Sequence, residues 1–364
     1  MAGLYIHIPF CHSKCVYCDF YSSPRRNNME AVAKGIIDEF NQRRLEIDEP
    51  FTTIYIGGGT PSILTSQTLS AILKSLPIDD AFEITIEANP EDVSENNVAL
   101  WRSLGINRVS MGIQSLNDAT LHFLGRRHTA ENSLDAVKML KNGGFDNISV
   151  DLIYGIPGLG EKEWEESLTL LMKQPITHLS AYCLTYHEGT YLFKIWKQGK
   201  ITPSTDEQIE RQFNILQDVA RREGFEHYEI SNLAKPGFRS AHNSSYWEPS
   251  SKWLGIGPSA HSFDGKVRRV DISDTARWLE RLPTPFEIEY ETDTDLVNDN
   301  IVTSLRTLEG LDLDTVPEKY RASLIKDAEP FIKSGDMELK ANRLSIIPSK
   351  WLISDSYLRK LIRD

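Results

Sequence analysis

The sequence has no apolar run near the ~20 residues that a membrane-spanning helix requires. Its opening residues, MAGLYIHIP, contain neither a basic segment nor a long apolar one, unlike a secretory signal. Concentrated basic charge is also missing: the clusters are pairs such as Arg126 and Arg127, and the net charge is −12. An acidic surface repels polyphosphate backbones. We therefore expect a cytoplasmic protein with no membrane span and no nucleic-acid partner.

Cysteine is also scarce, and its distribution is uneven. Of the four cysteines in 364 residues, three fall within eight positions, at Cys11, Cys15 and Cys18. Cytosolic proteins rarely keep disulfides, so a tight group of thiols there indicates a metal site or catalysis. The remaining Cys183 is expected to be a small buried core residue rather than a fourth ligand.

The first two-thirds of the chain alternates short apolar segments with amphipathic ones. Six β-α units in a row predict a parallel sheet, because parallel strands need crossover connections. The unusual polar residues lie at or near the carboxyl ends of these strands, and in a β/α barrel such ends converge on one mouth. A flat doubly wound sheet would concentrate them at one switch point instead. We predict an α/β fold, a partial (β/α)6 barrel, with strands near 4–8, 53–56, 82–88, 108–111, 149–153 and 179–184.

The pattern changes after residue 186. A stretch dense in Gly, Ser, His and aromatic residues over 235–264 predicts loops. Near the C-terminus, a helical pattern precedes a hairpin pattern over 337–347, an order that suggests a small winged-helix-like domain. We therefore divide the chain into three parts: a core domain (1–230), a loop-rich connecting segment (231–290) and a small C-terminal domain (291–364).

The three clustered thiols have the spacing C-x-x-x-C-x-x-C over residues 11–18. Thiolates are the usual ligands of iron–sulfur clusters, and three of them leave one iron of a [4Fe–4S] cluster open. That iron can chelate an amine and a carboxylate, a pair that S-adenosylmethionine (SAM) carries. A zinc site completed by His7 or His12, or a disulfide with a spare thiol, are the alternatives, and the sequence favours them less.

Further motifs extend the pattern along the chain, and together with the cysteines they resemble the HemN/HemW branch of the radical SAM superfamily. The resemblance implies a [4Fe–4S] cluster on Cys11, Cys15 and Cys18, with SAM bound beside it. The matching segments are LYIHIPFC over 4–11, GGGTP over 57–61, MGIQS over 111–115, DLIYGIPG over 151–158 and YEISN over 228–232.

The resemblance also implies a set of residues that contact SAM. Glycines at 57–59 allow close backbone approach, although alone they could form only a tight turn. Carboxylates on apolar strands are costly to bury unpaired, which favours functional roles for them. Arg126 could equally be a surface residue. The implied SAM contacts are Tyr5, Tyr17, Gly58, Gly59, Thr60, Glu87, Gln114, Arg126 and Asp151.

Two functions are compatible with this branch: a haem chaperone that passes haem to acceptor proteins, and oxygen-independent coproporphyrinogen III dehydrogenase. The dehydrogenases carry a fourth cysteine where this chain has Phe20, and an N-terminal extension that this chain does not show. The segment HNSSYW over 242–247 matches the H-N-x-x-Y-W signature of the HemW side. The resemblance therefore favours the chaperone, with an acceptor protein and an electron donor as partners, and leaves enzymatic activity open.

The H-N-x-x-Y-W segment supplies candidate haem contacts. A neutral imidazole such as His242 is a common axial haem ligand, and Tyr246 and Trp247 offer flat apolar faces. His261 is a second candidate ligand. A histidine in an aromatic loop is, taken alone, more often a hydrogen-bonded structural residue, so that interpretation stays open.

Overall fold

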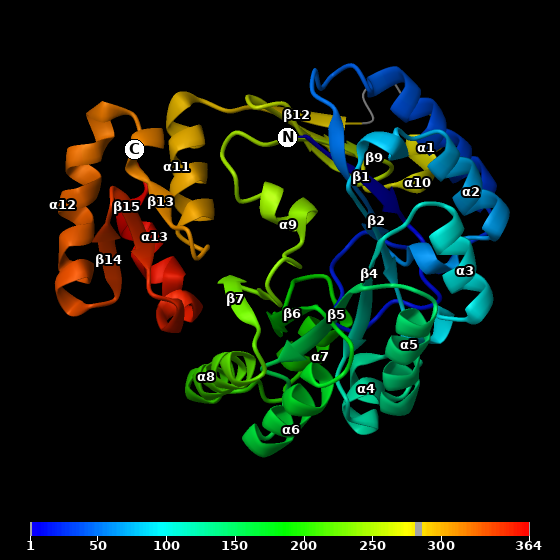
Figure 1. Ribbon diagram of the computed structural model, residues 1–364, viewed down its shortest axis with the longest axis horizontal. Helices are drawn as coiled ribbons and strands as arrows, with labels where there is room; N and C mark the ends of the chain where they lie inside the picture. The colour runs from blue at the N-terminus through cyan, green and yellow to red at the C-terminus, as the bar shows by residue number, and fades with distance from the viewer. Residues whose placement is uncertain (1, 281–285, 364) are drawn as a thin grey trace.

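The computed structural model describes residues 2–280 and 286–363. Six parallel strands form the centre of its main sheet, in the order of the sequence (Figure 1). Their bounds agree with the expected strands to within a few residues, which confirms the predicted α/β class. They are β1 (Ala2–Ile8), β2 (Phe51–Gly58), β3 (Glu83–Ala88), β4 (Arg108–Gln114), β5 (Asn147–Tyr154) and β6 (His178–Cys183).

Helices connect these strands and cover the outer face of the sheet (Figure 1). Several begin at side-chain caps, such as Thr129, whose hydroxyl accepts the amide hydrogen of Asn132 in a capping box. Gly125 ends one helix in the left-handed conformation, with φ of 77°. The helices are α1 (Met29–Arg43), α2 (Ser66–Lys74), α3 (Glu95–Ser103), α4 (Asp118–Leu124), α5 (Ala130–Asn142), α6 (Glu161–Met172), α7 (Tyr191–Lys197) and α8 (Asp206–Arg222).

The two faces of the strands differ in chemistry because successive side chains point to opposite sides. Outward residues such as Ile6 and Ile54 are fully buried against the helices and form the core. Inward positions carry polar groups instead, including Tyr55, Glu87 and Arg108. The curved sheet therefore encloses a polar interior that opens at the carboxyl ends of the strands.

The sheet continues beyond both edges of the parallel array into residues that the sequence predicts as loop-rich. β9 pairs with β1 in parallel, so β1 is an interior strand. The prediction of loops over 231–290 is wrong there, because short polar strands leave little periodicity. β7 (Glu226–Glu229) lies within the predicted core domain and pairs with β8 at the other edge. The elements within 231–290 are β8 (Asn232–Ala234), α9 (Ala241–Ser245), β9 (Lys252–Ile256), β10 (His261–Phe263), β11 (Val267–Asp271), α10 (Thr275–Glu280) and β12 (Phe286–Tyr290).

The C-terminal residues build a small α/β unit beside α8 and α9 (Figure 1). Its antiparallel sheet has the order β13-β15-β14 and includes the expected hairpin. The unit joins the core by backbone hydrogen bonds from Ile230 to Arg306 and from Leu308 to Tyr228, both 2.9 Å. Its elements are α11 (Asp293–Ser304), β13 (Leu311–Asp312), α12 (Glu318–Ser334), β14 (Met337–Lys340), β15 (Arg343–Ile346) and α13 (Ser354–Leu361).

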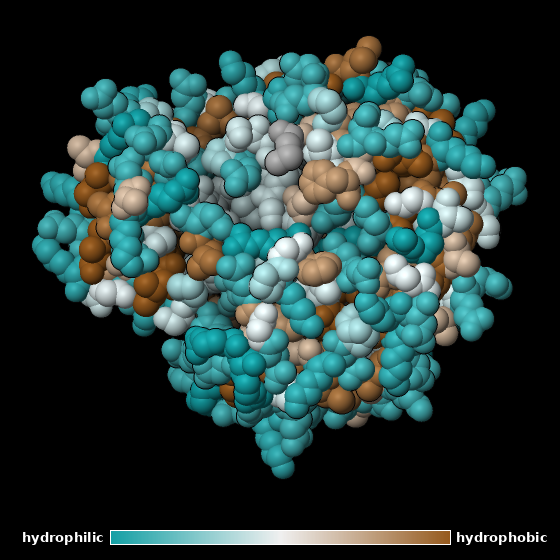
Figure 2. Space-filling view, in the orientation of Figure 1, coloured by the Kyte–Doolittle hydropathy of each residue, from teal (hydrophilic) through white to brown (hydrophobic). Residues whose placement is uncertain are grey.

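The surface has the polar character that the composition implies. Hydrophilic side chains cover most of the face in Figure 2, with apolar patches between them over the outer helices. Within the described ranges, no helix combines the length and hydropathy needed to cross a membrane.

Candidate functional site

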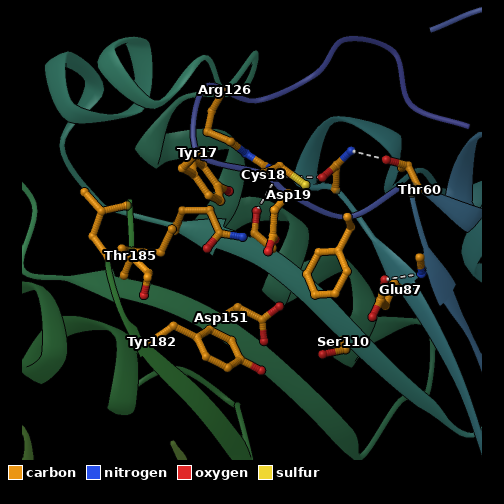
Figure 3. Close-up of a pocket in the computed structure, with 18 of the residues that line it drawn as sticks. Tyr17, Cys18, Asp19, Thr60, Glu87, Ser110, Arg126, Asp151, Tyr182 and Thr185 are labelled. Atoms are coloured by element: carbon orange, nitrogen blue, oxygen red, sulfur yellow. Dashed lines mark hydrogen bonds between the residues drawn. The ribbon is translucent and has the colours of Figure 1, made fainter. Parts of the chain in front are cut away.

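A cavity of about 470 Å³ opens at the carboxyl ends of the parallel strands. Its floor carries Glu87, Ser110 and Asp151 from β3, β4 and β5, and the cluster loop with Cys18 and Asp19 lies across from them (Figure 3). This is where active sites of β/α barrels are built. All nine residues predicted to contact SAM line this one cavity: Tyr5, Tyr17, Gly58, Gly59, Thr60, Glu87, Gln114, Arg126 and Asp151.

The three clustered cysteines line a smaller adjoining space of about 70 Å³, which shares Tyr17 and Cys18 with the main cavity. All three are free thiols and partly exposed. Thr60 Oγ1 donates to Cys11 Sγ and an Arg126 guanidinium nitrogen donates to Cys15 Sγ, each at 3.4 Å. Burial raises the pKa of the Cys18 thiol to about 11, with the neighbouring thiols adding to the rise. A thiol with its pKa raised in this way ionises readily only when a cation binds it.

This donor set fits an iron–sulfur cluster better than a single metal ion. Each cysteine of a cluster binds a different iron, so the thiols need to surround a space rather than meet at one point. No three His, Cys, Asp or Glu side chains among residues 2–280 and 286–363 converge on one ion position. The histidines of the zinc alternative are engaged elsewhere: His7 with Tyr21, and His12 with Asp92.

The glycine motif has a structural role that is visible in the backbone. A Cβ on Gly59 would lie 2.5 Å from the carbonyl oxygen of Phe10, and one on Gly58, which has φ of 105°, would lie 2.6 Å from the ring of His7. The Gly58 amide also donates to Glu87 at 3.1 Å. The glycines therefore let the β2 end pack against the cluster loop, and they form one wall of the cavity.

Replacing Gly59 with alanine is expected to destabilise the fold by about 1–3 kcal/mol, because the new methyl group meets backbone that has no room to move. The measurement is urea unfolding. Gly160→Ala is the matched control, since nothing lies within 4 Å of a Cβ at that position. Equal stability of the two variants would contradict this role for Gly59.

Glu87 lies partly buried in the floor of the cavity. One carboxylate oxygen accepts the Tyr55 hydroxyl at 2.8 Å and the other accepts the Gly58 amide at 3.1 Å. Burial raises its pKa to about 7, the Tyr55 bond opposes the rise, and the charge of Asp151 adds to it. Glu87 is therefore poised to ionise near neutral pH, when a cationic ligand would stabilise the charged form.

Asp151 is the second carboxylate of the floor. Burial raises its pKa to about 6, against a hydrogen bond with Ser180 and the positive charge of Arg108. Arg108 itself, which the sequence analysis did not single out, is fully buried on β4. None of its guanidinium nitrogens has a hydrogen-bond partner among the described residues. It is the counter-charge beneath the two carboxylates.

Arg126 is a partly buried residue that lines the cavity, which favours the cavity interpretation over that of a simple surface residue. One of its guanidinium nitrogens donates to Asn89 Oδ1 at 2.6 Å and to the carbonyl oxygen of Gly112 at 2.7 Å. Gln114 lies in the left-handed region with φ of 70°, a strained conformation for a residue with a Cβ. Both residues thus hold the β4 end in the shape of the cavity wall.

The tyrosines flank the cavity as expected. Tyr5 stacks on Tyr55 with ring centroids 6.1 Å apart, and its hydroxyl is 3.1 Å from His7 Nδ1. Tyr17, next to Cys18 on the loop, lines both cavities. Cys183, expected in the core, is partly exposed and lies in the cavity wall, where burial raises its pKa to about 11.

The structure places His242 in the interior, where it is 1% exposed. Its Nδ1 is 2.8 Å from Thr53 Oγ1 and its Nε2 is 2.9 Å from the Tyr246 hydroxyl, so both ring nitrogens are engaged. Its ring also stacks on Tyr55 at 5.1 Å. This arrangement favours the hydrogen-bonded alternative over a haem-ligand role for His242, because neither ring nitrogen is free.

The other haem candidates do not share one pocket. Tyr246 lines a 370 Å³ cavity with Trp253, whereas Trp247 lines a neighbouring 310 Å³ cavity beside α11. His261 is exposed on β10. The structure therefore does not assemble the candidates into a single haem site. His187, which carries no sequence signature of its own, was missed and lines the mouth of the main cavity. Phe20, noted in the sequence only for its position in the cysteine motif, lines it as well.

Comparison with known proteins agrees with this geometry. The family model described as "Radical SAM superfamily" matches residues 5–171 of this chain. "Heme chaperone HemW" from Lactococcus lactis is 31% identical over 329 residues, which cover 88% of this chain and 86% of that protein. The protein of the same name from Synechocystis sp. is 34% identical over 353 residues, covering 91% and 84%. The radical SAM enzyme coproporphyrinogen III oxidase (HemN) from Escherichia coli superposes with a TM-score of 0.84 at 21% identity, covering 99% of this chain and 90% of that one.

The fold and the match over 5–171 define a radical SAM protein, a class that implies a [4Fe–4S] cluster and SAM. Similarity over nearly the whole length goes further, and the chain belongs to the HemW family. The resemblance seen in the sequence is confirmed, and so is the HemN-like fold.

Proposed function

We propose that this protein is a haem chaperone that holds a [4Fe–4S] cluster on Cys11, Cys15 and Cys18 and binds SAM in the adjoining cavity. The observation that carries the proposal is the full-length similarity to proteins named heme chaperone HemW. Haem as cargo, an acceptor protein that receives it and an electron donor are parts of the proposal.

The chain's own residues supply the binding chemistry. Cys11, Cys15 and Cys18 would hold the cluster, which would supply an open iron for the amine and carboxylate of SAM and an electron for its cleavage. Glu87 and Asp151 supply negative charge for the cationic ligand, and Arg126 donates to Cys15 while it braces the wall at Gly112. The loop and the strand ends enclose the space, which strengthens these electrostatic contacts by excluding water.

One feature of the loop favours the chaperone over the alternative dehydrogenase. Phe20 stands where the dehydrogenases have their fourth cysteine, and its side chain is 65% exposed at the cavity mouth. A thiol there could take part in redox or acid–base chemistry, whereas a phenyl ring offers only a flat apolar surface. Such a surface suits binding of a flat ligand.

The assay that separates the two functions is anaerobic incubation of the reconstituted protein with SAM and coproporphyrinogen III. We expect no protoporphyrinogen IX, detected by chromatography after oxidation, and we expect one haem per chain to be retained on gel filtration. The Escherichia coli HemN protein serves as the positive control for the reaction. Turnover of coproporphyrinogen would overturn the chaperone proposal in favour of the dehydrogenase.

A further inference from the structure

The mouth of the main cavity carries aromatic side chains that solvent reaches. Two of them line the cavity: Phe20 of the cluster loop, which is 65% exposed, and Tyr182 at the end of β6, which is 43% exposed. Tyr191, at the start of the adjoining helix α7, is 59% exposed. The loop and α7 are in contact, since the Leu192 amide donates to the carbonyl oxygen of Val16 at 2.8 Å. Exposed aromatic groups gathered at a cavity mouth typically mark a binding surface.

A histidine stands within this surface. His187 lines the cavity mouth, and its Nδ1 lies 3.4 Å from Asp19 Oδ2 on the cluster loop. Its side chain is 48% exposed, and no hydrogen bond to its Nε2 occurs within the described residues. A carboxylate on one ring nitrogen is the usual second contact of a metal-ligating histidine, because it fixes the tautomer and raises the basicity of the other nitrogen.

Positive charge collects on the neighbouring helix of this acidic protein. Lys194 and Lys197 on α7 and Lys200 just after it are exposed, and none of them forms an ion pair in the part of the chain that the structure describes. The Lys197 ammonium lies 4.5 Å from the centre of the Trp196 ring. Aromatic faces next to free ammonium groups match a flat apolar ligand with acidic substituents.

We infer that haem binds across the cavity mouth, with His187 Nε2 as its axial ligand, Phe20 and Tyr191 against its faces and Lys194 and Lys197 facing its propionates. The inference rests on the proposed function and gives the cargo a location away from His242. Haem has the required chemistry: an iron that histidine ligates, a flat apolar ring and two carboxylates. A haem placed there covers the SAM cavity, so cargo and SAM contact the same mouth.

The test is an anaerobic haem titration of the reconstituted full chain, followed by its Soret band. In His187→Ala the band is expected to shift to that of haem without its protein ligand, and the Kd to rise at least about tenfold. His261→Ala, which removes an exposed histidine from β10, is the matched control and should titrate as the parent protein does. Thermal unfolding checks that the His187→Ala substitution, at an exposed position, leaves the fold intact.

A charge variant tests the site independently. Lys194→Glu is expected to weaken haem binding several-fold and to make it less salt-dependent, whereas Lys162→Glu on the outer helix α6 should have no effect. If His187→Ala and Lys194→Glu both titrate as the parent protein does, the inference is overturned. If the parent protein itself binds no haem, the proposed function fails first, and the two failures are thereby distinguished.

Discussion

Replacing Cys15 with serine is expected to yield a folded protein that, after anaerobic reconstitution with iron and sulfide, lacks the brown absorbance of a [4Fe–4S] cluster. Two of three thiolates hold a cluster poorly, and a hydroxyl is a weak ligand for iron. The loop itself has other supports, such as the backbone bond from Val16 to Leu124 at 3.2 Å. Iron analysis measures the loss of the cluster, and circular dichroism measures whether the variant is folded.

Cys183→Ser is the matched control for that experiment. Cys183 lies in the cavity wall but outside the space that the three loop cysteines line. The control should keep its full iron content. Full iron content in the Cys15 variant, or zinc in the parent protein, would contradict the assignment of the cluster to the loop.

The second large effect is expected at Glu87, where glutamine should weaken SAM binding by about 10- to 100-fold while it stabilises the protein without ligand. A hydrogen bond to a charged group contributes roughly 1.5–3 kcal/mol, and the variant loses the charge that faces the cationic ligand. Isothermal titration with SAM measures the first effect. S-adenosylhomocysteine, which lacks the sulfonium charge, is the control ligand and should lose less affinity.

The stabilisation of the ligand-free protein by Glu87→Gln is expected to depend on pH. Burial raises the pKa of Glu87 from 4.5 to about 7, so the folded protein resists ionisation that the unfolded chain undergoes freely. Between pH 4.5 and 7 this term lowers the stability of the ligand-free protein as pH rises, by at most about 3 kcal/mol, and it is absent below pH 4.5. The variant should match the parent protein at low pH and exceed it at pH 8, as measured by urea unfolding.

The affinity for SAM should rise with pH over the range in which the stability of the ligand-free protein falls. In the parent protein, affinity is expected to rise from pH 5 to 8 as Asp151 and then Glu87 ionise near pH 6 and 7. The Glu87→Gln variant should keep only the lower of these steps. An unchanged profile, or a variant less stable than the parent protein at pH 8, would show that the Glu87 charge does not serve the ligand.

The sequence predicted the strands of the barrel because their signal is local. Apolar outward residues such as Ile54 alternate with polar inward ones such as Tyr55, and the helices between them carry regular caps. The loop cysteines were also predictable, since three ligands within eight positions need no tertiary information. The gathering of the predicted SAM contacts in one cavity follows from the parallel topology.

What the sequence did not predict depends on contacts between distant segments. β9 and β1 are about 250 positions apart in the chain, and short strands such as Val267–Asp271 carry charged residues in place of an apolar pattern. The segment that begins at His242 has the composition of a haem-binding loop, but the partners of the His242 ring, Thr53 and Tyr55, come from β2. Only the folded structure shows that these partners occupy both ring nitrogens.

The interior position of β1 has a consequence for how the protein is made. β1 leaves the ribosome well before its partner β9, which ends at Ile256, so one edge of β1 stays unpaired in the meantime. At about 5–20 residues per second, synthesis of that stretch takes on the order of tens of seconds. The cysteine loop therefore follows a strand that is paired on one edge only until β9 is made, and we expect a cluster to be inserted after that point.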